Sequence, residues 1–153
     1  MFHIILFTPQ IPPNTGNIIR LSANTGTKLH LIEPLGFQLD AKSCRRAGLD
    51  YHALANVHLH KNLDECSKAL GSARLFAITS HGTKSLFDQK FATGDAFLFG
   101  SETAGLPETI HASFTAKQKL RLPMIAGNRS LNLANAASVV VYEAWRQTGF
   151  ASI

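Results

Sequence analysis

The sequence predicts an α/β fold in which helices cover both faces of a mostly parallel β-sheet. Short apolar runs that are typical of strands alternate along the chain with helical patterns, and this alternation indicates parallel β-α-β units. Loops rich in Gly, Pro, Asn and Ser directly follow several of these runs, as they do at the edge of open α/β sheets where ligands bind. The chain has 153 residues and no shift in composition, so we expect a single domain spanning residues 1–153.

Strands are predicted where apolar residues cluster between turn residues, and helices where capping residues flank a helical pattern. The expected strands are His3 to Phe7, Lys28 to Ile32, Arg74 to Thr79, Asp95 to Phe99 and Lys119 to Leu122. The helices expected between them begin at Asn14 and end near Thr25, run from Asp40 to Gly48, and run from Asn62 or Asp64 to Gly71.

The last predicted helix, residues 131–147, is the most unusual element of the chain. Ser130 is expected to be its N-cap, because a serine hydroxyl can accept a hydrogen bond from an amide in the first turn. From Ser130 to Tyr142 the sequence contains no charged residue, whereas a surface helix normally has a polar face. We therefore expect this helix to be covered on more than one side, by its own domain and by a second subunit.

Composition limits the possible classes of function. Cys44 and Cys66 lie far from any C-x-x-C spacing, so neither a zinc site nor a disulfide framework is predicted. The seven histidines have no ligand spacing on a predicted helix and no obvious orienting carboxylate, so we interpret them as scattered residues and expect no metal. No apolar run approaches the roughly 20 residues of a membrane span, and no secretory signal is visible, which predicts a cytoplasmic protein. The net charge of +5 is compatible with a nucleic-acid partner without requiring one.

The segment after the first predicted strand is the first that can carry chemistry. Neither G-x-G-x-x-G nor G-x-x-x-x-G-K-[ST] occurs in the chain, so a conventional dinucleotide or P-loop site is not predicted. Asn17 and Arg20 instead lie about one helical turn apart and share a face. Arg20 is a candidate clamp for an anion, although a solvated surface arginine has the same pattern.

Two further segments each combine a strand end with an irregular loop. In residues 97–108, Gly100 and Gly105 allow the backbone to approach a ligand, and Pro107 suits the start of a helix; a plain strand-to-helix turn is the alternative. In residues 120–133, Leu122 and Met124 can line an apolar slot or pack in the core.

With these segments the chain resembles the SPOUT class of RNA methyltransferases and, within it, the TrmL/YibK group, which methylates the ribose 2′-hydroxyl at the wobble position of tRNA. The resemblance covers nearly the whole chain and is carried by residues 11–21, 45–52, 99–107, 129–136 and 140–147. It implies a C-terminal trefoil knot that binds S-adenosylmethionine, and a homodimer formed through the knot helices. Close relatives often have other residues at three positions, occupied here by Ser101, Ala104 and Ala134.

The resemblance also implies roles for individual residues. Those expected in catalysis are Arg20, Asn17, Ser130 and Asn132. Those expected at the cofactor are Ile78, Thr79, Gly100, Glu102, Gly105, Leu122, Met124 and Ser130. Those expected to contact RNA are Asn14, Arg20, Arg45, Arg46, Arg129 and Tyr142.

We therefore expect methyl transfer from S-adenosylmethionine to the 2′-hydroxyl of nucleotide 34 of tRNA, a cytidine or modified uridine, with S-adenosylhomocysteine as the product. Two alternatives remain open. One is the same chemistry at another tRNA or rRNA site. The other is a non-catalytic RNA-binding homodimer, which is favoured by Ala104 at a position where relatives often have arginine.

Overall fold

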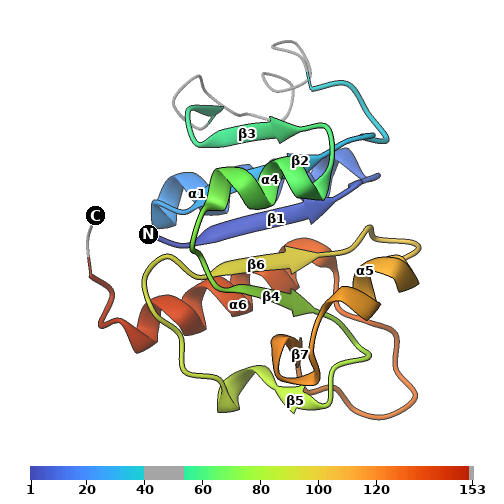
Figure 1. Ribbon diagram of the computed structural model, residues 1–153, viewed down its shortest axis with the longest axis vertical. Helices are drawn as coiled ribbons and strands as arrows, with labels where there is room; N and C mark the ends of the chain where they lie inside the picture. Colours follow the sequence, from blue (N-terminus) through green and yellow to red (C-terminus); the bar gives the residue numbers. More distant parts are fainter. Residues whose placement is uncertain (40–53, 152–153) are drawn as a thin grey trace.

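The computed structural model describes residues 1–39 and 54–151. In that part of the chain, seven strands form one sheet in the order β3-β2-β1-β6-β4-β7-β5 (Figure 1). All the strand pairs are parallel. The strands are β1 His3–Phe7, β2 Lys28–Ile32, β3 Val57–His60, β4 Leu75–Ile78, β5 Lys84–Ser85, β6 Ala96–Phe99 and β7 Lys119–Arg121. The predicted α/β class with a parallel sheet is confirmed.

The predicted strands agree closely with the observed ones. β1 and β2 have the predicted bounds, and β4, β6 and β7 are shorter than predicted by one or two residues. β3 and β5 were not predicted. Each lies at an edge of the sheet; β3 alternates apolar residues with histidines, and β5 has only two residues. Neither strand therefore has the continuous apolar run that marks a buried parallel strand.

The helices within the described residues are α1 Pro12–Thr25, α4 Leu63–Leu70, α5 Glu108–Ser113 and α6 Leu133–Gln147, with two short 3₁₀ turns, η1 Leu86–Asp88 and η2 Ala116–Gln118. Asn62 caps α4 and Gly71 follows its last turn, as predicted. The helix expected from Asp40 to Gly48 lies outside the described residues.

Two of the predicted helix starts are wrong. α1 begins at Pro12 instead of Asn14, because prolines fit the first turn of a helix, where no amide donor is needed. α6 is capped by Asn132 instead of Ser130: the Asn132 Oδ1 atom accepts hydrogen bonds from the amides of Ala134 at 2.9 Å and Asn135 at 3.3 Å.

Helices cover both faces of the sheet, as expected. On one face, α1 and α6 pack beside each other against the strands; on the other, α4 covers β1 to β3, and α5 lies near the end of β6 (Figure 1). α6 buries Ala137, Val140, Val141 and Ala144 completely. Its opposite side exposes Val139 and Tyr142 to solvent, so within one chain the helix is covered on one side only.

The C-terminal half of the sheet is assembled out of sequence order. β7 is inserted between the two earlier strands β4 and β5, and the chain then returns to α6 behind β6. This arrangement brings the ends of β4, β6 and β7 together with the start of α6.

Candidate active site

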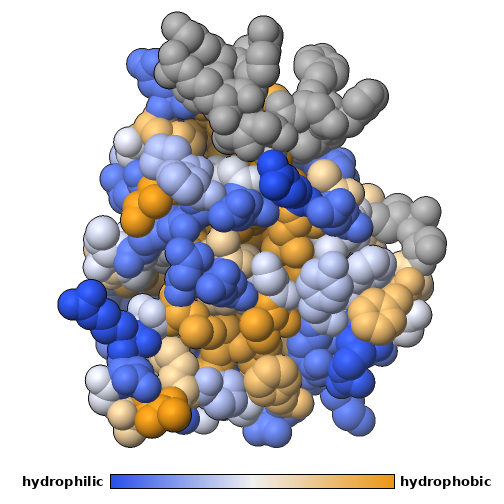
Figure 2. All heavy atoms as spheres, turned by 180° about the vertical axis from the view of Figure 1, so that it is seen from behind, coloured by the Kyte–Doolittle hydropathy of each residue, from blue (hydrophilic) through white to orange (hydrophobic). Residues whose placement is uncertain are grey.

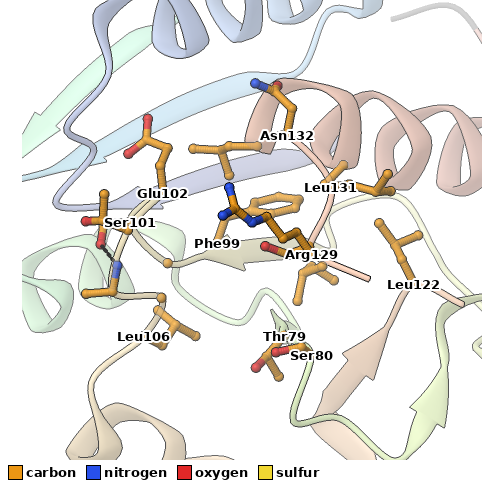
Figure 3. Close-up of a pocket in the computed structure, with 18 of the residues that line it drawn as sticks. Thr79, Ser80, Phe99, Ser101, Glu102, Leu106, Leu122, Arg129, Leu131 and Asn132 are labelled. Atoms are coloured by element: carbon orange, nitrogen blue, oxygen red, sulfur yellow. Dashed lines mark hydrogen bonds between the residues drawn. The ribbon is translucent and has the colours of Figure 1, made fainter. Parts of the chain in front are cut away.

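A cavity of about 550 Å³ lies at the carboxyl ends of β4, β6 and β7. Its walls come from the start of α1, residues 78–81, residues 99–106, residues 121–124 and residues 129–133 (Figure 3). In parallel α/β sheets this is the edge at which ligands bind, and the volume is typical of a site for a small molecule or cofactor.

The structure brings together the whole set of residues expected at the cofactor. Ile78, Thr79, Gly100, Glu102, Gly105, Leu122, Met124 and Ser130 all line the cavity. Arg129 and Asn132 line it as well, and the guanidinium of Arg129 points into it (Figure 3). The buried side chains of Phe99, Leu106 and Leu122 form an apolar part of the wall.

The loop after β6 is a tight turn closed by its own backbone. Ser101 and Gly105 exchange two backbone hydrogen bonds, of 3.1 and 2.9 Å, and the Ser101 hydroxyl accepts a third from the amide of Ala104 (Figure 3). A Cβ atom on Gly100 would lie 2.2 Å from the carbonyl carbon of Gly105. Gly105 itself has a φ of +68°, which favours glycine. Both glycines are therefore required by the conformation of this loop.

A chain of side-chain hydrogen bonds joins three parts of the cavity wall. Asn132 donates from Nδ2 to Asn14 Oδ1 at 2.9 Å, and Asn14 donates from Nδ2 to Glu102 Oε1 at 3.1 Å. The Glu102 carboxylate also accepts hydrogen bonds from the backbone amides of Gln10 at 2.8 Å and Ile11 at 3.1 Å. The first turn of α6, the first turn of α1 and the loop after β6 are thus held in one arrangement.

This network gives two expected residues a positioning role. Asn14 was expected to contact RNA, but its side chain is buried and both of its amide atoms are bonded within the chain. Glu102 lines the cavity, yet its carboxylate is bound to the start of α1. The sequence indicated this network only indirectly. Asn132 precedes a helix that has no charged residue in its first turns, so its amide group needs a partner elsewhere in the chain.

The Glu102 carboxyl group is held in its ionised form. Burial by itself raises its pKa, but the hydrogen bonds from the Gln10, Asn14 and Ile11 donors outweigh this effect and leave the pKa below the ordinary value of 4.5. A depressed folded-state pKa stabilises the folded protein above the unfolded pKa, and this stability is lost as the pH falls through the folded pKa.

We therefore expect Glu102→Gln to lower the free energy of unfolding most at neutral pH. The difference from the wild-type protein should shrink as the pH falls below 4.5, since protonation weakens the same hydrogen bonds in the wild type. Urea unfolding at a series of pH values measures this difference. A difference that stays constant from pH 7 to pH 3 would contradict an ionised Glu102.

Two histidines that were interpreted as scattered also line the cavity. His81 and His111 have ring centroids 5.1 Å apart. His111 is buried, its Nδ1 atom has no hydrogen-bond partner, and burial, together with the nearby His81, lowers its pKa. It is therefore a neutral imidazole at the cavity wall, with its Nδ1 atom shielded from solvent. Sequence reasoning missed this pair because its members lie on different elements, the loop after β4 and α5.

Three of the other expected residues do not line the cavity. Asn17 and Arg20 are exposed on α1, and Tyr142 is exposed on α6, so none of the three lines it. Arg45 and Arg46 lie outside the described residues. Figure 2 shows apolar side chains gathered on the face that carries α1 and α6. Leu131, two residues before α6, and Val139 and Tyr142, on α6, are exposed. Among residues 1–39 and 54–151, no helix is long and apolar enough to cross a membrane.

The SpoU rRNA Methylase family matches residues 1–142. The chain belongs to this family. Among its relatives, a tRNA (cytidine(34)-2′-O)-methyltransferase from Methylovorus glucosotrophus is 56% identical over 151 residues, covering 99% of this chain and 98% of the relative. A second relative is a solved structure from work on the 2-OH methylation of C/U34 on tRNA, and it is 44% identical to this chain. The two structures superpose with a TM-score of 0.89, covering 99% of this chain and 98% of the other.

A further SpoU methyltransferase, AviRb from Streptomyces viridochromogenes, has been solved in complex with the cofactor AdoMet. It is 29% identical, with a TM-score of 0.79 over 97% of this chain and 61% of that chain. The SpoU methylase fold confirms the predicted class and is consistent with the expected trefoil knot. Knots are so rare that no argument from element spacing alone would have predicted one.

Proposed function

We propose that the chain transfers a methyl group from S-adenosylmethionine to the ribose 2′-hydroxyl of nucleotide 34 in tRNA. The observation that carries the proposal is the match, along nearly its whole length, to a relative named for this reaction, at 56% identity. The cavity supports it, because all eight of the residues expected at the cofactor line it.

The described residues fit the proposed cofactor. The loop after β6 is closed so tightly that a Cβ atom on Gly100 would collide with it, and such a glycine lets the backbone approach a bound ligand. Phe99, Leu106 and Leu122 provide an apolar surface for a planar base. When bound, S-adenosylmethionine supplies an electrophilic methyl group on a sulfonium.

The Gly100 loop gives a direct test of the cofactor site. In Gly100→Ala the new methyl group must displace the Gly105 backbone, and overpacking of this kind costs about 1–3 kcal/mol. We expect S-adenosylmethionine to bind about 5- to 150-fold more weakly, as measured by isothermal titration calorimetry. Gly149→Ala is the matched control: its Cβ atom meets nothing within 4 Å, but the φ of +70° strains the backbone, so this variant loses stability at a position that does not line the cavity. Equal affinity of both variants would count against the cavity as the cofactor site.

Arg20 is proposed to bind the RNA backbone beside the target ribose and to stabilise the negative charge that develops on the 2′-oxygen. An arginine keeps its proton at ordinary pH, so it cannot serve as a base. Asn17 lies one turn away on the same helix and assists it. Ser130 and Asn132, at the rim of the cavity, position the reacting groups, while Asn132 also caps α6.

Because Arg20 does not line the cavity of its own chain, its role requires a homodimer. We propose that two chains pair through the apolar face of α6 and bring α1 of one chain towards the cavity of the other. The exposed Leu131, Val139 and Tyr142 form an apolar surface suited to such contact. Arg129, at the cavity, and Arg45 and Arg46 are proposed to contact tRNA phosphates, and Tyr142 to lie close to the bound RNA.

The proposed function is tested by incubating the chain with labelled S-adenosylmethionine and total tRNA, followed by nuclease mapping of the labelled ribose. The proposal requires label at the 2′-oxygen of nucleotide 34. Label at another position, in tRNA or in rRNA, would identify a different target for the same chemistry. Binding of tRNA without any transfer would identify the non-catalytic homodimer, which Ala104 favours.

A further inference from the structure

A second polar cluster lies beneath α4, on the half of the sheet away from the cavity. His30 on β2, His60 on β3 and Cys66 on α4 are 4%, 8% and 0% exposed. Their possible ligand atoms all lie within 4.8 Å of one another. None of the three residues lines the cofactor cavity, so the proposed methyl transfer does not explain why they meet.

The sheet register brings these residues together. β2 and β3 are parallel, with His30 opposite His58 and Ile32 opposite His60. Alternate residues of a strand share a face, so His30 shares a face with Ile32, which packs in the same buried cluster as Cys66 of α4, and His60 is paired with Ile32. α4 covers this face of the sheet (Figure 1). α4 begins at Leu63 and carries Cys66 in its first turns. The three residues come from three elements, and no short sequence spacing could have indicated them.

The imidazoles form a chain of short contacts. His30 Nδ1 is 2.9 Å from His60 Nε2, and His30 Nε2 is 3.1 Å from His3 Nδ1. When the three imidazoles are neutral, each of these two contacts can hold one proton, so both contacts are hydrogen bonds. For a cation to bind His30 Nδ1 and His60 Nε2, His60 would adopt its other neutral tautomer, with its proton moved from Nε2 to Nδ1. His30 Nε2–H would still donate to His3. Metal-bound histidines are commonly oriented by such a second hydrogen bond.

Burial keeps the imidazoles of the cluster neutral and the Cys66 thiol protonated. Burial, together with the neighbouring His3 and His60, lowers the pKa of His30 to about 3. Burial also lowers the pKa of His60, against the opposing effect of Glu65. Neutral imidazole is the form that binds metals. Burial and the nearby Glu65 raise the pKa of the Cys66 thiol to about 12, so its proton would leave to solvent only when a cation takes its place.

We propose that His30, His60 and Cys66 bind a divalent transition metal of the zinc type, which joins α4 to β2 and β3. Nitrogen and sulfur donors suit zinc, whereas magnesium and calcium require oxygen ligands. In a tetrahedral zinc site the ligand atoms lie about 3.3–3.6 Å apart. The His30 and His60 rings therefore separate slightly, and the Cys66 side chain closes by about 1 Å at most.

The fourth coordination position is taken by water or by His58. His58 is exposed on β3, and its ring stacks on that of His30 with centroids 5.1 Å apart. The role of the metal is structural, because the cluster is separate from the cavity. It fixes the edge strand β3 and the first turns of α4 to the interior of the sheet.

The test uses the full chain, stripped with a chelator and then titrated with Co²⁺ or Zn²⁺. We expect about one metal ion per chain by elemental mass spectrometry, and with Co²⁺ a thiolate-to-metal charge-transfer absorption that Zn²⁺ abolishes by competition. Zinc at about 100 times its dissociation constant should raise the melting temperature by about 5–10 °C. Cys66→Ala and His60→Gln should lose both the cobalt absorption and the thermal shift.

The chain has two cysteines, and Cys44→Ala is the matched control. This variant keeps Cys66 as its last thiol, so a retained cobalt absorption assigns the ligand even where Cys66→Ala fails to fold. Cofactor binding by Cys66→Ala, which should be unchanged, shows whether that variant is folded. The proposal is overturned if the stripped wild-type chain takes up no metal, if the absorption disappears in Cys44→Ala, or if folded Cys66→Ala retains it.

Discussion

Replacing Arg20 with alanine should lower the rate of methyl transfer to tRNA by at least about 100-fold, because a residue that stabilises developing charge contributes on this scale. The affinity for S-adenosylmethionine should not change, since Arg20 does not line the cavity. Single-turnover assays with labelled cofactor measure the rate, and calorimetry measures the affinity.

Lys68→Ala is the control for this loss. It removes one positive charge from α4, on the other face of the sheet, and should leave the rate near that of the wild-type protein. A normal rate in Arg20→Ala would refute the catalytic role. A parallel loss in both variants would show that overall charge, rather than the position of Arg20, governs the reaction.

Replacing Val139 with arginine should convert the proposed homodimer into monomers. Val139 is exposed in one chain and lies among the apolar residues of α6. In a two-fold interface each substitution appears twice, and a single uncompensated buried charge costs about 3–5 kcal/mol. We expect the dissociation constant of the dimer to rise by at least about 100-fold, as measured by analytical ultracentrifugation.

Methyl transfer should fall in parallel with dissociation, because the proposal requires α1 of one chain near the cavity of the other. Phe87→Arg is the matched control, since Phe87 is also an exposed apolar residue but lies on η1 rather than on α6. If Val139→Arg sediments like the wild-type protein at micromolar concentration, the α6 face is not the interface. If it is monomeric and fully active, Arg20 does not act across subunits.

The sequence predicted the buried strands well because their signal is local. β1 and β2 are short, strongly apolar runs bounded by turn residues, and their limits could be read directly. β3 has half its residues polar, and its polar residues are the histidines that face α4. The same polarity that concealed the strand also concealed the cluster, since both depend on pairing with β2.

The candidate site was predictable where it depends on strand ends and unpredictable where it depends on distant partners. Loops that follow parallel strands converge at one edge, and the resemblance assigned residues within those loops. The hydrogen bond between Asn14 and Asn132 has no local signal, and it moved Asn14 from an expected RNA contact to a buried brace. The same side chain, Asn132, caps α6 through its Oδ1 atom while its Nδ2 atom donates to Asn14.

The separation of these two asparagines also determines when the site can form. They are 118 residues apart, so the network that closes the cavity is complete only after α6 has docked against α1. During synthesis, most of the chain must therefore leave the ribosome before a finished cofactor site exists, and contacts of such long range form slowly. If the proposed cofactor binds only the closed cavity, it stabilises the last step of folding by mass action, and refolding in its presence should then yield more native protein.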